Sequence, residues 1–357
     1  MIAKRTLKVL AKGEKMDKIN LPEIGKLDKE TFESVIFPRL GKPDKRVLLK
    51  PMHGVDAGVI DLGDKVMVVA EDPTFGMPVL MPYFGWAIVH ICASDVAVLG
   101  VKPEFMTICL LLLPGTKTED LESIWSQIDT ECKNLGKSIV GGHSGVYPGI
   151  SYPLNGGCTV WGFGKKEDLT PASNAKIGDR VIITKGPAIE ATGILAIQAE
   201  KELREKLGEP ITKRAKKLFL EMSVVKEALI ARKYAHAMHD ATEGGLLNGI
   251  YEIANASKTG VKIYEELIIV PEEVSAVCNY FKIDPLISIS EGTLIITVPE
   301  RNVAKVKTAL EKEKISCFII GEITKGEKIF IRKNGSKEIL RPVKVDPFWN
   351  AYFSILK

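Results

Sequence analysis

The chain of 357 residues lacks a strong excess of either charge. It contains 49 Lys and Arg against 45 Asp and Glu, which leaves a formal net charge of only +4. So small an excess gives no electrostatic reason to bind nucleic acid or an anionic membrane. The densest basic stretch, Lys213–Lys217, is typical of a solvated helix face, although a phosphate or a partner surface would also fit it. We therefore expect no nucleic acid and no membrane as a partner.

Long hydrophobic runs and metal-type cysteine pairs are also missing. The longest apolar run, Ile108–Leu113, is far shorter than the ~20 residues that span a bilayer, and the charged start resembles no signal peptide. None of the 6 cysteines forms a C-x-x-C pair, which disfavours a zinc site and a disulfide framework. With 45% hydrophobic and 26% charged residues, the sequence predicts a cytoplasmic globular protein with buried thiols.

Four familiar chemical signatures are absent as well. No G-x-x-x-x-G-K-[ST] is present, which excludes a Walker-type phosphate loop, and no G-x-G-x-x-G leads from a strand into a helix. No nucleophile elbow or Ser-His-Asp order is visible, and no cysteine has an activating neighbour. The sequence therefore supports neither a Rossmann fold nor covalent catalysis by a thiol.

What the sequence does contain is an alternation of strand and helix patterns. Short apolar runs such as Val47–Lys50 and Val66–Ala70 alternate with helical patterns such as Tyr83–Leu99, and a second series begins at Arg180–Thr184. This order predicts two α/β units. The predicted segments are an extension at 1–45, a first domain at 46–165, a second domain at 175–335 and a tail at 336–357.

Four aspartates stand out by their settings. Asp56, Asp72 and Asp240 lie at the ends of predicted strands, while Asp95 lies inside an otherwise apolar helix. Taken singly, the strand-end aspartates are most often caps or turn residues. A carboxylate within an apolar helix is costly to bury unless it is paired or bound to a metal. Because carboxylates at several strand ends can converge, the set suggests a hard cation such as Mg²⁺.

Two glycine-rich turns also follow predicted strands. One contains Gly141, Gly142 and His143, and the other, which opens a predicted helix, contains Gly244 and Gly245. Glycines at such points let backbone N–H groups approach phosphate oxygens. Turns use glycine for positive φ in any case, and His143 is more often a local hydrogen-bonding residue than a ligand. The turns are therefore candidate phosphate contacts only in combination with the aspartates.

The order of these motifs resembles a known superfamily, that of aminoimidazole ribonucleotide (AIR) synthetase, selenophosphate synthetase, thiamine-monophosphate kinase and the hydrogenase-maturation protein HypE. The resemblance covers roughly residues 24 to 332. In the second half, Glu252–Ser257 and Asp284–Leu286 are most similar to the HypE branch. The motifs that carry the resemblance are Gly54–Ile60, Glu71–Pro73, Ala93–Pro103, Gly141–Ser144, His239–Leu246 and Ser290–Leu294.

The resemblance implies a two-domain α/β (α+β-like) fold of the PurM/HypE type. The N-terminal sheets of two subunits would pair into a barrel across a homodimer, and ATP with Mg²⁺ would lie in a cleft near that interface. By motif, the metal carboxylates would be Asp56, Asp72, Asp95 and Asp240, of which Asp95 and Asp240 would also be catalytic. The nucleotide would be bound by Gly141, Gly142, His143, Thr242, Gly244 and Gly245.

The sequence also departs from the family pattern. Val55 stands where a second acidic residue is frequent, and Ser94 replaces an asparagine, a change that thiamine-phosphate kinases share. HypE carries a carbamoyl-accepting cysteine near its C-terminus, whereas the last cysteine here is Cys317. Selenophosphate synthetases carry a reactive cysteine or selenocysteine near the N-terminus. The first cysteine here, Cys92, lies instead in a predicted helix.

These features predict a HypE-like, ATP- and Mg²⁺-dependent enzyme with a diverged acceptor. The acceptor would be a small molecule or a protein-bound carboxamide, and a maturation protein would be a partner. Two alternatives stay open: a phosphotransferase like thiamine-monophosphate kinase, and a non-catalytic nucleotide-binding assembly partner.

Overall fold

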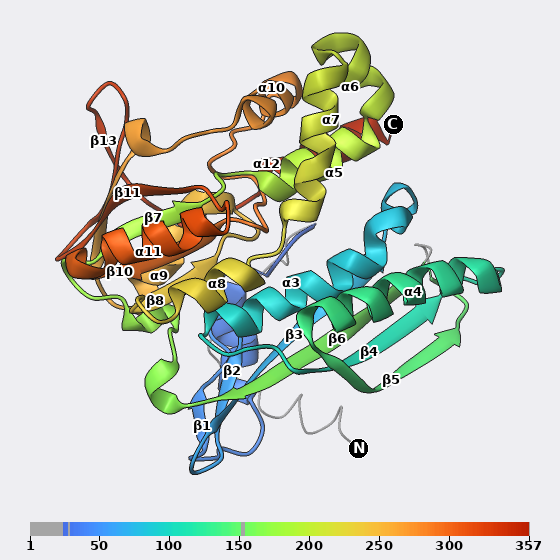
Figure 1. The fold of residues 1–357 in the computed structure, drawn as a ribbon, viewed down its shortest axis with the longest axis horizontal. Helices are drawn as coiled ribbons and strands as arrows, with labels where there is room; N and C mark the ends of the chain where they lie inside the picture. Colours follow the sequence, from blue (N-terminus) through green and yellow to red (C-terminus); the bar gives the residue numbers. More distant parts are fainter. Residues whose placement is uncertain (1–23, 28, 151–153, 357) are drawn as a thin grey trace, which may run out of the picture.

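The computed structural model describes residues 24–27, 29–150 and 154–356, which form two α/β units packed against each other (Figure 1). The first unit contains a 6-stranded sheet in the order β1-β2-β3-β6-β4-β5, antiparallel except for the parallel pair β4–β5. Its strands are β1 (Val47–Leu49), β2 (Gly58–Asp61), β3 (Val66–Gly76), β4 (Phe105–Leu112), β5 (Ser138–Val146) and β6 (Leu154–Gly164).

Strand alternation gives the first sheet one covered face. On β4, every second side chain, from Met106 to Leu112, is buried, whereas the intervening ones are only partly buried. On β3, Val66, Val68 and Ala70 form the corresponding buried row. The covering helices are α3 (Phe84–Val98) and α4 (Thr118–Leu135), and α3 lies between this sheet and the second unit (Figure 1).

Helix α3 is apolar on nearly all sides because both of its sides are covered. It contacts α4 and β3 of the first unit and α8 and β8 of the second. Together with the preceding turn it forms an apolar stretch, Pro78–Val98, of 21 residues with a hydropathy of 1.4. By length and composition alone this stretch could cross a membrane, but 61% of its window is buried inside the structure, as in a core helix.

The second unit contains a 7-stranded sheet in the order β13-β12-β9-β11-β7-β10-β8, antiparallel except for β12–β9. Its strands are β7 (Arg180–Thr184), β8 (Ala237–Asp240), β9 (Gly260–Tyr264), β10 (Leu294–Val298), β11 (Cys317–Thr324), β12 (Lys328–Ile331) and β13 (Lys337–Ile339). The helices are α5 (Ile189–Gln198), α6 (Glu200–Leu207), α7 (Glu209–Lys217), α8 (Val225–Ala231), α9 (Gly245–Ala256), α10 (Glu272–Phe281), α11 (Glu300–Lys312) and α12 (Pro347–Ile355).

The central strands of the second sheet are buried on both faces, which explains their continuous apolar runs. Ile182 and Ile296 belong to a core shared with α3, α8 and α11, whereas Ile183 and Ile295 pack with residues of α9. The first of these cores includes residues of both sheets. The two units are therefore joined by a common apolar core, and β8 and α3 meet within it.

The expected two-unit α/β fold is confirmed, with several local differences. The glycine-rich segment Gly141–Gly145 continues β5 instead of forming a turn, because it pairs with β4 as far as Val146. The basic stretch Lys213–Lys217 lies in α7, and a 3₁₀ turn at Leu218–Glu221 separates this helix from α8. Lys185 donates to the carbonyls of Glu221 and Ser223 at the break, so a tertiary contact satisfies groups that a continuous helix would have used.

Candidate functional site

Five acidic side chains gather where β3, α3 and β8 meet. We call Asp56, Asp72, Asp95, Asp240 and Glu291 the carboxylate cluster; the first four were expected from the sequence. Burial, and then the charges of Asp72, Asp240, Asp56 and Glu291, raise the pKa of Asp95 well above its usual value. Each of these groups therefore lies close enough to act electrostatically on Asp95.

The strand pattern explains how two of these carboxylates reach the interior. Asp72 continues the core-facing row Val66, Val68 and Ala70 of β3, so its side chain points toward α3. Asp240 is the last residue of β8 and is completely buried. Burial and the neighbouring Asp56 raise the pKa of Asp240 to about 7. The cluster thus occupies positions where an apolar residue would otherwise fill the core.

Several oxygens of the cluster have no hydrogen-bond partner among the described residues. They are both carboxylate oxygens of Asp240, one oxygen of Asp72 and one of Glu291. Buried polar atoms are nearly always hydrogen-bonded, so a group of four unsatisfied acceptors in one place requires an explanation. A cation with oxygen ligands would satisfy them.

His239 forms charge pairs with two acidic side chains, Asp56 of the cluster and Glu252 beside it. Its Nδ1 lies 2.8 Å from Asp56 Oδ2, and its Nε2 lies 2.8 Å from Glu252 Oε2. Burial alone would lower the pKa of His239, but the two carboxylates raise it well above its usual value. The imidazolium thus fixes Asp56 and Glu252 through both ring nitrogens. Ligand atoms of Asp56, His239 and Asp240 lie within 4.8 Å of one another, but both nitrogens of His239 are already engaged.

Lys26 brings a cation to the cluster from the N-terminal segment. Its Nζ donates to Thr242 Oγ1 at 2.9 Å, and its backbone N–H donates to Glu243 Oε2 at 3.0 Å. Burial of the ammonium lowers its pKa, but Glu252, Glu291, Asp72 and Asp95 raise it above the usual value. The residue as a whole is exposed, and only its ammonium reaches in among the acids.

The turn at Thr242–Gly245 connects Asp240 to α9. Gly244 and Gly245 both have positive φ, +86° and +67°, and a Cβ on Gly245 would lie 2.6 Å from Ser288 O. The N–H of Gly244 donates to Asp346 Oδ2 at 2.7 Å, and the N–H of Gly245 donates to Thr242 O at 3.0 Å. The glycines are thus needed for the conformation of the turn, and in this structure their N–H groups are already bonded within the chain.

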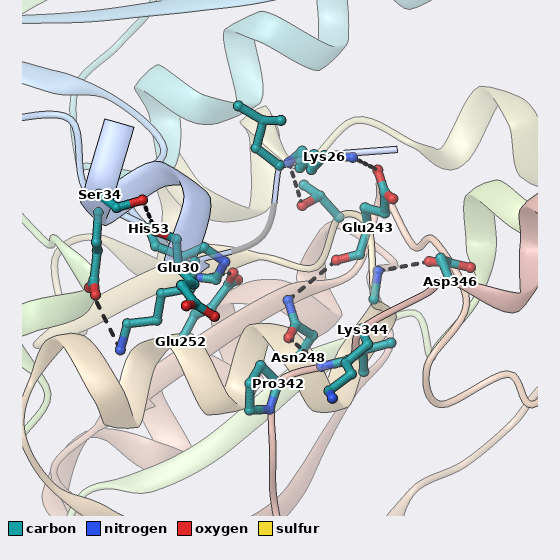
Figure 2. A pocket seen from close by; sticks show the side chains of 16 residues that line it. Lys26, Glu30, Ser34, His53, Glu243, Asn248, Glu252, Pro342, Lys344 and Asp346 are labelled. Atoms are coloured by element: carbon teal, nitrogen blue, oxygen red, sulfur yellow. Dashed lines mark hydrogen bonds and ion pairs between the residues drawn. The ribbon is translucent and has the colours of Figure 1, made fainter. Parts of the chain in front are cut away.

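A cavity of about 730 Å³ lies beside this turn, a volume within the range of small-molecule sites. It is lined by Thr242 and Gly244, but Gly245 is not among its lining residues. Figure 2 shows that Lys26, Glu252 and Asp346 face it from three separate segments of the chain. The cavity therefore connects the N-terminal segment, α9 and the C-terminal segment next to the carboxylate cluster.

The structure does not bring Gly141, Gly142 and His143 to the cluster. Gly142 aligns across the sheet with Asp72, through Ile108 and Cys158, and is thus three strand spacings, roughly 14 Å, away. Gly142 is required because a Cβ would lie 2.2 Å from Ile108 O. His143 is exposed and contacts Tyr147 OH at 2.6 Å. Within one chain this segment is a close-packed edge strand, and its predicted nucleotide contact stays a prediction.

The donor set fits Mg²⁺. The unsatisfied atoms are carboxylate oxygens, which Mg²⁺ prefers, and the nearby imidazole is held as a cation by two acids. Asp240, Asp72 and Glu291 offer free oxygens for the ion, with Asp56 and Asp95 beside them. An ammonium among these acids, that of Lys26, already shows that the cluster attracts positive charge.

Sequence reasoning missed three functional side chains. Lys26, Glu252 and Glu291 carried no signal of their own, because an exposed-looking lysine and two acids near helices are common in any sequence. Glu291 lies in a Ser-Glu-Gly motif and Glu252 begins the HypE-like stretch Glu252–Ser257, and these resemblances are the signals that could have identified them. Lys26 becomes visible only through its contacts with a distant segment.

Two family models match the chain. The N-terminal domain of AIR synthase related proteins matches residues 54–162, and the C-terminal domain of the same family matches residues 176–334. Both matched regions contain members of the carboxylate cluster: Asp56, Asp72 and Asp95 in the first, and Asp240 and Glu291 in the second.

Curated relatives have different activities. A putative hydrogenase expression/formation protein of Methanocaldococcus jannaschii is 26% identical over 281 residues, which cover 76% of this chain and 80% of that protein. A selenide, water dikinase of Clostridium botulinum is 27% identical, covering 78% and 86%. A thiamine-monophosphate kinase of Pyrococcus horikoshii is 27% identical, covering 80% and 88%.

Solved structures share the fold. A HypE–HypF complex has a TM-score of 0.64 at 24% identity and covers 80% of this chain and 93% of that chain. HypE in complex with ATP has a TM-score of 0.63 at 21% identity, covering 89% and 93%. AaThiL complexed with AMPPCP and TMP has a TM-score of 0.65 at 19% identity, covering 82% and 90%. With both domain models matched in order, the chain belongs to the family of AIR synthase related proteins.

Proposed function

We propose that this protein is a Mg²⁺- and ATP-dependent enzyme that is most similar to HypE and transfers a phosphoryl group to an oxygen of its acceptor. The observation that carries the proposal is the set of buried, unsatisfied oxygens of Asp72, Asp240 and Glu291 beside a cavity large enough for a nucleotide. Fold neighbours that were solved with ATP and with AMPPCP support the choice of nucleotide.

Each group has a role that follows from its environment. Bound Mg²⁺ would neutralise phosphate charge and orient the transferred group. Asp72, Asp95 and Asp240 would hold the ion, and His239 fixes Asp56 in position through its Nδ1. Lys26 and Thr242 line the cavity and present an ammonium and a hydroxyl to anionic oxygens. Because β3, α3 and β8, which carry Asp72, Asp95 and Asp240, pack together against the common core of both units, the positions of these carboxylates are set before any ligand binds.

Isothermal titration with ATP and MgCl₂ tests this proposal. We expect wild-type protein to bind the nucleotide only with Mg²⁺ present and Asp95→Asn to lose most of this binding. Asp64→Asn, a change at an exposed loop position, is the matched control and should bind like the wild type. Equal binding by wild type and Asp95→Asn, or no binding by either, would contradict the assignment.

A homodimer through the first sheet is part of the proposal. The outer face of this sheet is not covered by α3 or α4 and carries exposed apolar side chains, including Val140 on β5 at 54% exposure. Pairing with a second copy would bury this face and form the expected barrel. It would also let Gly141, Gly142 and His143 reach a nucleotide across the interface. Sedimentation of the wild type and of Val140→Lys tests this. We expect the wild type to be a dimer and Val140→Lys to dimerise more weakly.

Two alternatives make different predictions. A thiamine-monophosphate kinase would form a diphosphate product from thiamine monophosphate in a coupled assay, and the relative from Pyrococcus horikoshii favours including this test. A non-catalytic assembly partner would bind nucleotide without turnover, and steady ATP hydrolysis that Asp240→Asn abolishes would exclude it. The HypE–HypF neighbour supports a maturation protein as a partner, which co-purification can test.

A further inference from the structure

A second, smaller cavity borders the carboxylate cluster at Asp72. It measures about 110 Å³ and is lined by residues of β3, α3 and α5 and of the two 3₁₀ turns Pro78–Tyr83 and Leu218–Glu221. Most of its lining is apolar; the largest side chains are Met77, Leu80, Phe84, Ile91, Phe219 and Met222. Because an apolar cavity of about 150 Å³ accommodates benzene, this one fits a smaller group such as isopropyl.

Three residues supply the polar part of the lining of this cavity. Asp72 and Thr74 continue the core-facing row of β3, and Glu190 lies in the first turn of α5. Thr74 is only 4% exposed, yet its hydroxyl has no hydrogen-bond partner among the described residues, and neither has Asp72 Oδ2. Two buried, unpaired acceptor atoms two residues apart on one strand face therefore border an apolar cavity.

The charges around this cavity select against anions. Among its lining residues there is no Lys, Arg or His, while Asp72 and Glu190 supply two carboxyl groups. The cation that acts on both of these acids is Lys26, and its ammonium is held by Thr242, which lines the larger cavity. A ligand carrying a carboxylate or phosphate into the small cavity would lose its water and find no basic side chain in the lining to pair with.

We propose that this cavity is the specificity pocket for the acceptor, and that it takes the compact apolar group of an uncharged molecule whose N–H or O–H group donates to the hydroxyl of Thr74. The inference rests on the proposed phosphoryl-transfer function and narrows its substrate class. It disfavours an acceptor that enters this pocket with its phosphate. The larger cavity would then hold the nucleotide and the smaller one the acceptor.

Matched probes test the charge and the size of the ligand. Isobutyramide carries an isopropyl group and a neutral N–H donor, and isobutyrate has the same shape with a negative charge. We expect saturation-transfer NMR to detect isobutyramide on the wild-type protein and to find isobutyrate at least about tenfold weaker. Equal binding of both probes, or preferred binding of isobutyrate or thiamine monophosphate, would overturn the proposal.

Two variants locate the probe. Thr74→Val removes the unpaired hydroxyl without changing the shape of the side chain, so binding of isobutyramide should weaken about tenfold while the melting temperature stays equal or rises. Ala87→Leu places extra volume in the lining of the pocket and should abolish binding. If either variant binds the probe like the wild type, the pocket assignment fails.

The same samples separate this inference from the function on which it rests. Titration with Mg²⁺ and ATP should give wild-type affinity in Thr74→Val and Ala87→Leu, which also shows that both variants are folded. Nucleotide binding without any binding of isobutyramide would overturn the pocket alone. Absence of nucleotide binding in the wild type would overturn the proposed function.

Discussion

The carboxylate cluster has two sides, and the buried negative charge is compensated differently on each. On one side, Asp56 and Glu252 each bond to a nitrogen of His239, so their charges are compensated within the protein. On the other side, the fully buried Asp240 has no hydrogen-bond partner among the described residues for either oxygen. The paired side fixes the geometry of the site. On the unpaired side, a cation from solution would form the most favourable new contacts with the carboxylates.

This difference separates residues that fold the site from residues that use it. Breaking a buried ion pair leaves an uncompensated charge, whereas neutralising a buried charge that has no partner relieves repulsion. Substitutions on the two sides should therefore change stability in opposite directions. Binding of Mg²⁺ should be lost most directly on the unpaired side.

The largest expected effect is on the paired side. His239→Leu leaves Asp56 and Glu252 without their shared cation in a site where His239 is only 2% exposed, so we expect the unfolding free energy to fall by about 3–5 kcal/mol. Urea unfolding measures it. Arg46→Met, which breaks the exposed Arg46–Asp44 pair, is the control and should leave the unfolding free energy nearly unchanged. A similar loss of unfolding free energy in both variants would show that the buried pairs stabilise the fold no more than the exposed pair does.

The unpaired side should give the opposite sign. Asp240→Asn removes a buried charge that Asp56 repels, so without Mg²⁺ we expect this variant to be more stable than the wild type by about 1–3 kcal/mol at pH 8. Thermal unfolding with and without Mg²⁺ and ATP provides the second half of the test. The wild type should gain stability from the ligands and Asp240→Asn should not. A destabilised Asp240→Asn would mean that the carboxylate has a structural partner.

The unequal success of sequence reasoning has a physical cause. Asp95 could be identified because an acid within an apolar helix is costly wherever that helix packs. The partners that decide the chemistry could not, since Asp56 and His239 are 183 residues apart and Lys26 and Thr242 are 216 apart. The glycine at 142 shows a further difficulty: glycine indicates a close approach, but here the approaching group is the carbonyl of Ile108 rather than a phosphate.

The buried acid Glu190 allows a further test, through the dependence of the unfolding free energy on pH. Burial raises its pKa from 4.5 to about 7, so between these values the folded state holds more protons than the unfolded state. The unfolding free energy should therefore fall as the pH rises through this interval, by on the order of 2 kcal/mol from this group. Glu190→Gln should flatten the curve from pH 4 to 8, and the exposed Glu205→Gln should not. An unchanged slope in Glu190→Gln would contradict the raised pKa.

The smallest effect is expected at Lys26, which compensates the unpaired side only from its exposed edge. Because its ammonium competes with a metal ion for the same carboxylates, Lys26→Gln should bind Mg²⁺ alone a few times, roughly threefold, more tightly. It should bind ATP less tightly, since one cation is missing from the cavity that Thr242 lines. Stability should change by less than about 0.5 kcal/mol. Titrations of Mg²⁺ and of ATP, with the exposed Lys45→Gln as control, measure both changes. If Mg²⁺ affinity falls together with ATP affinity, Lys26 organises the carboxylates instead of competing for them, and the unpaired side would then depend on the N-terminal segment for its geometry.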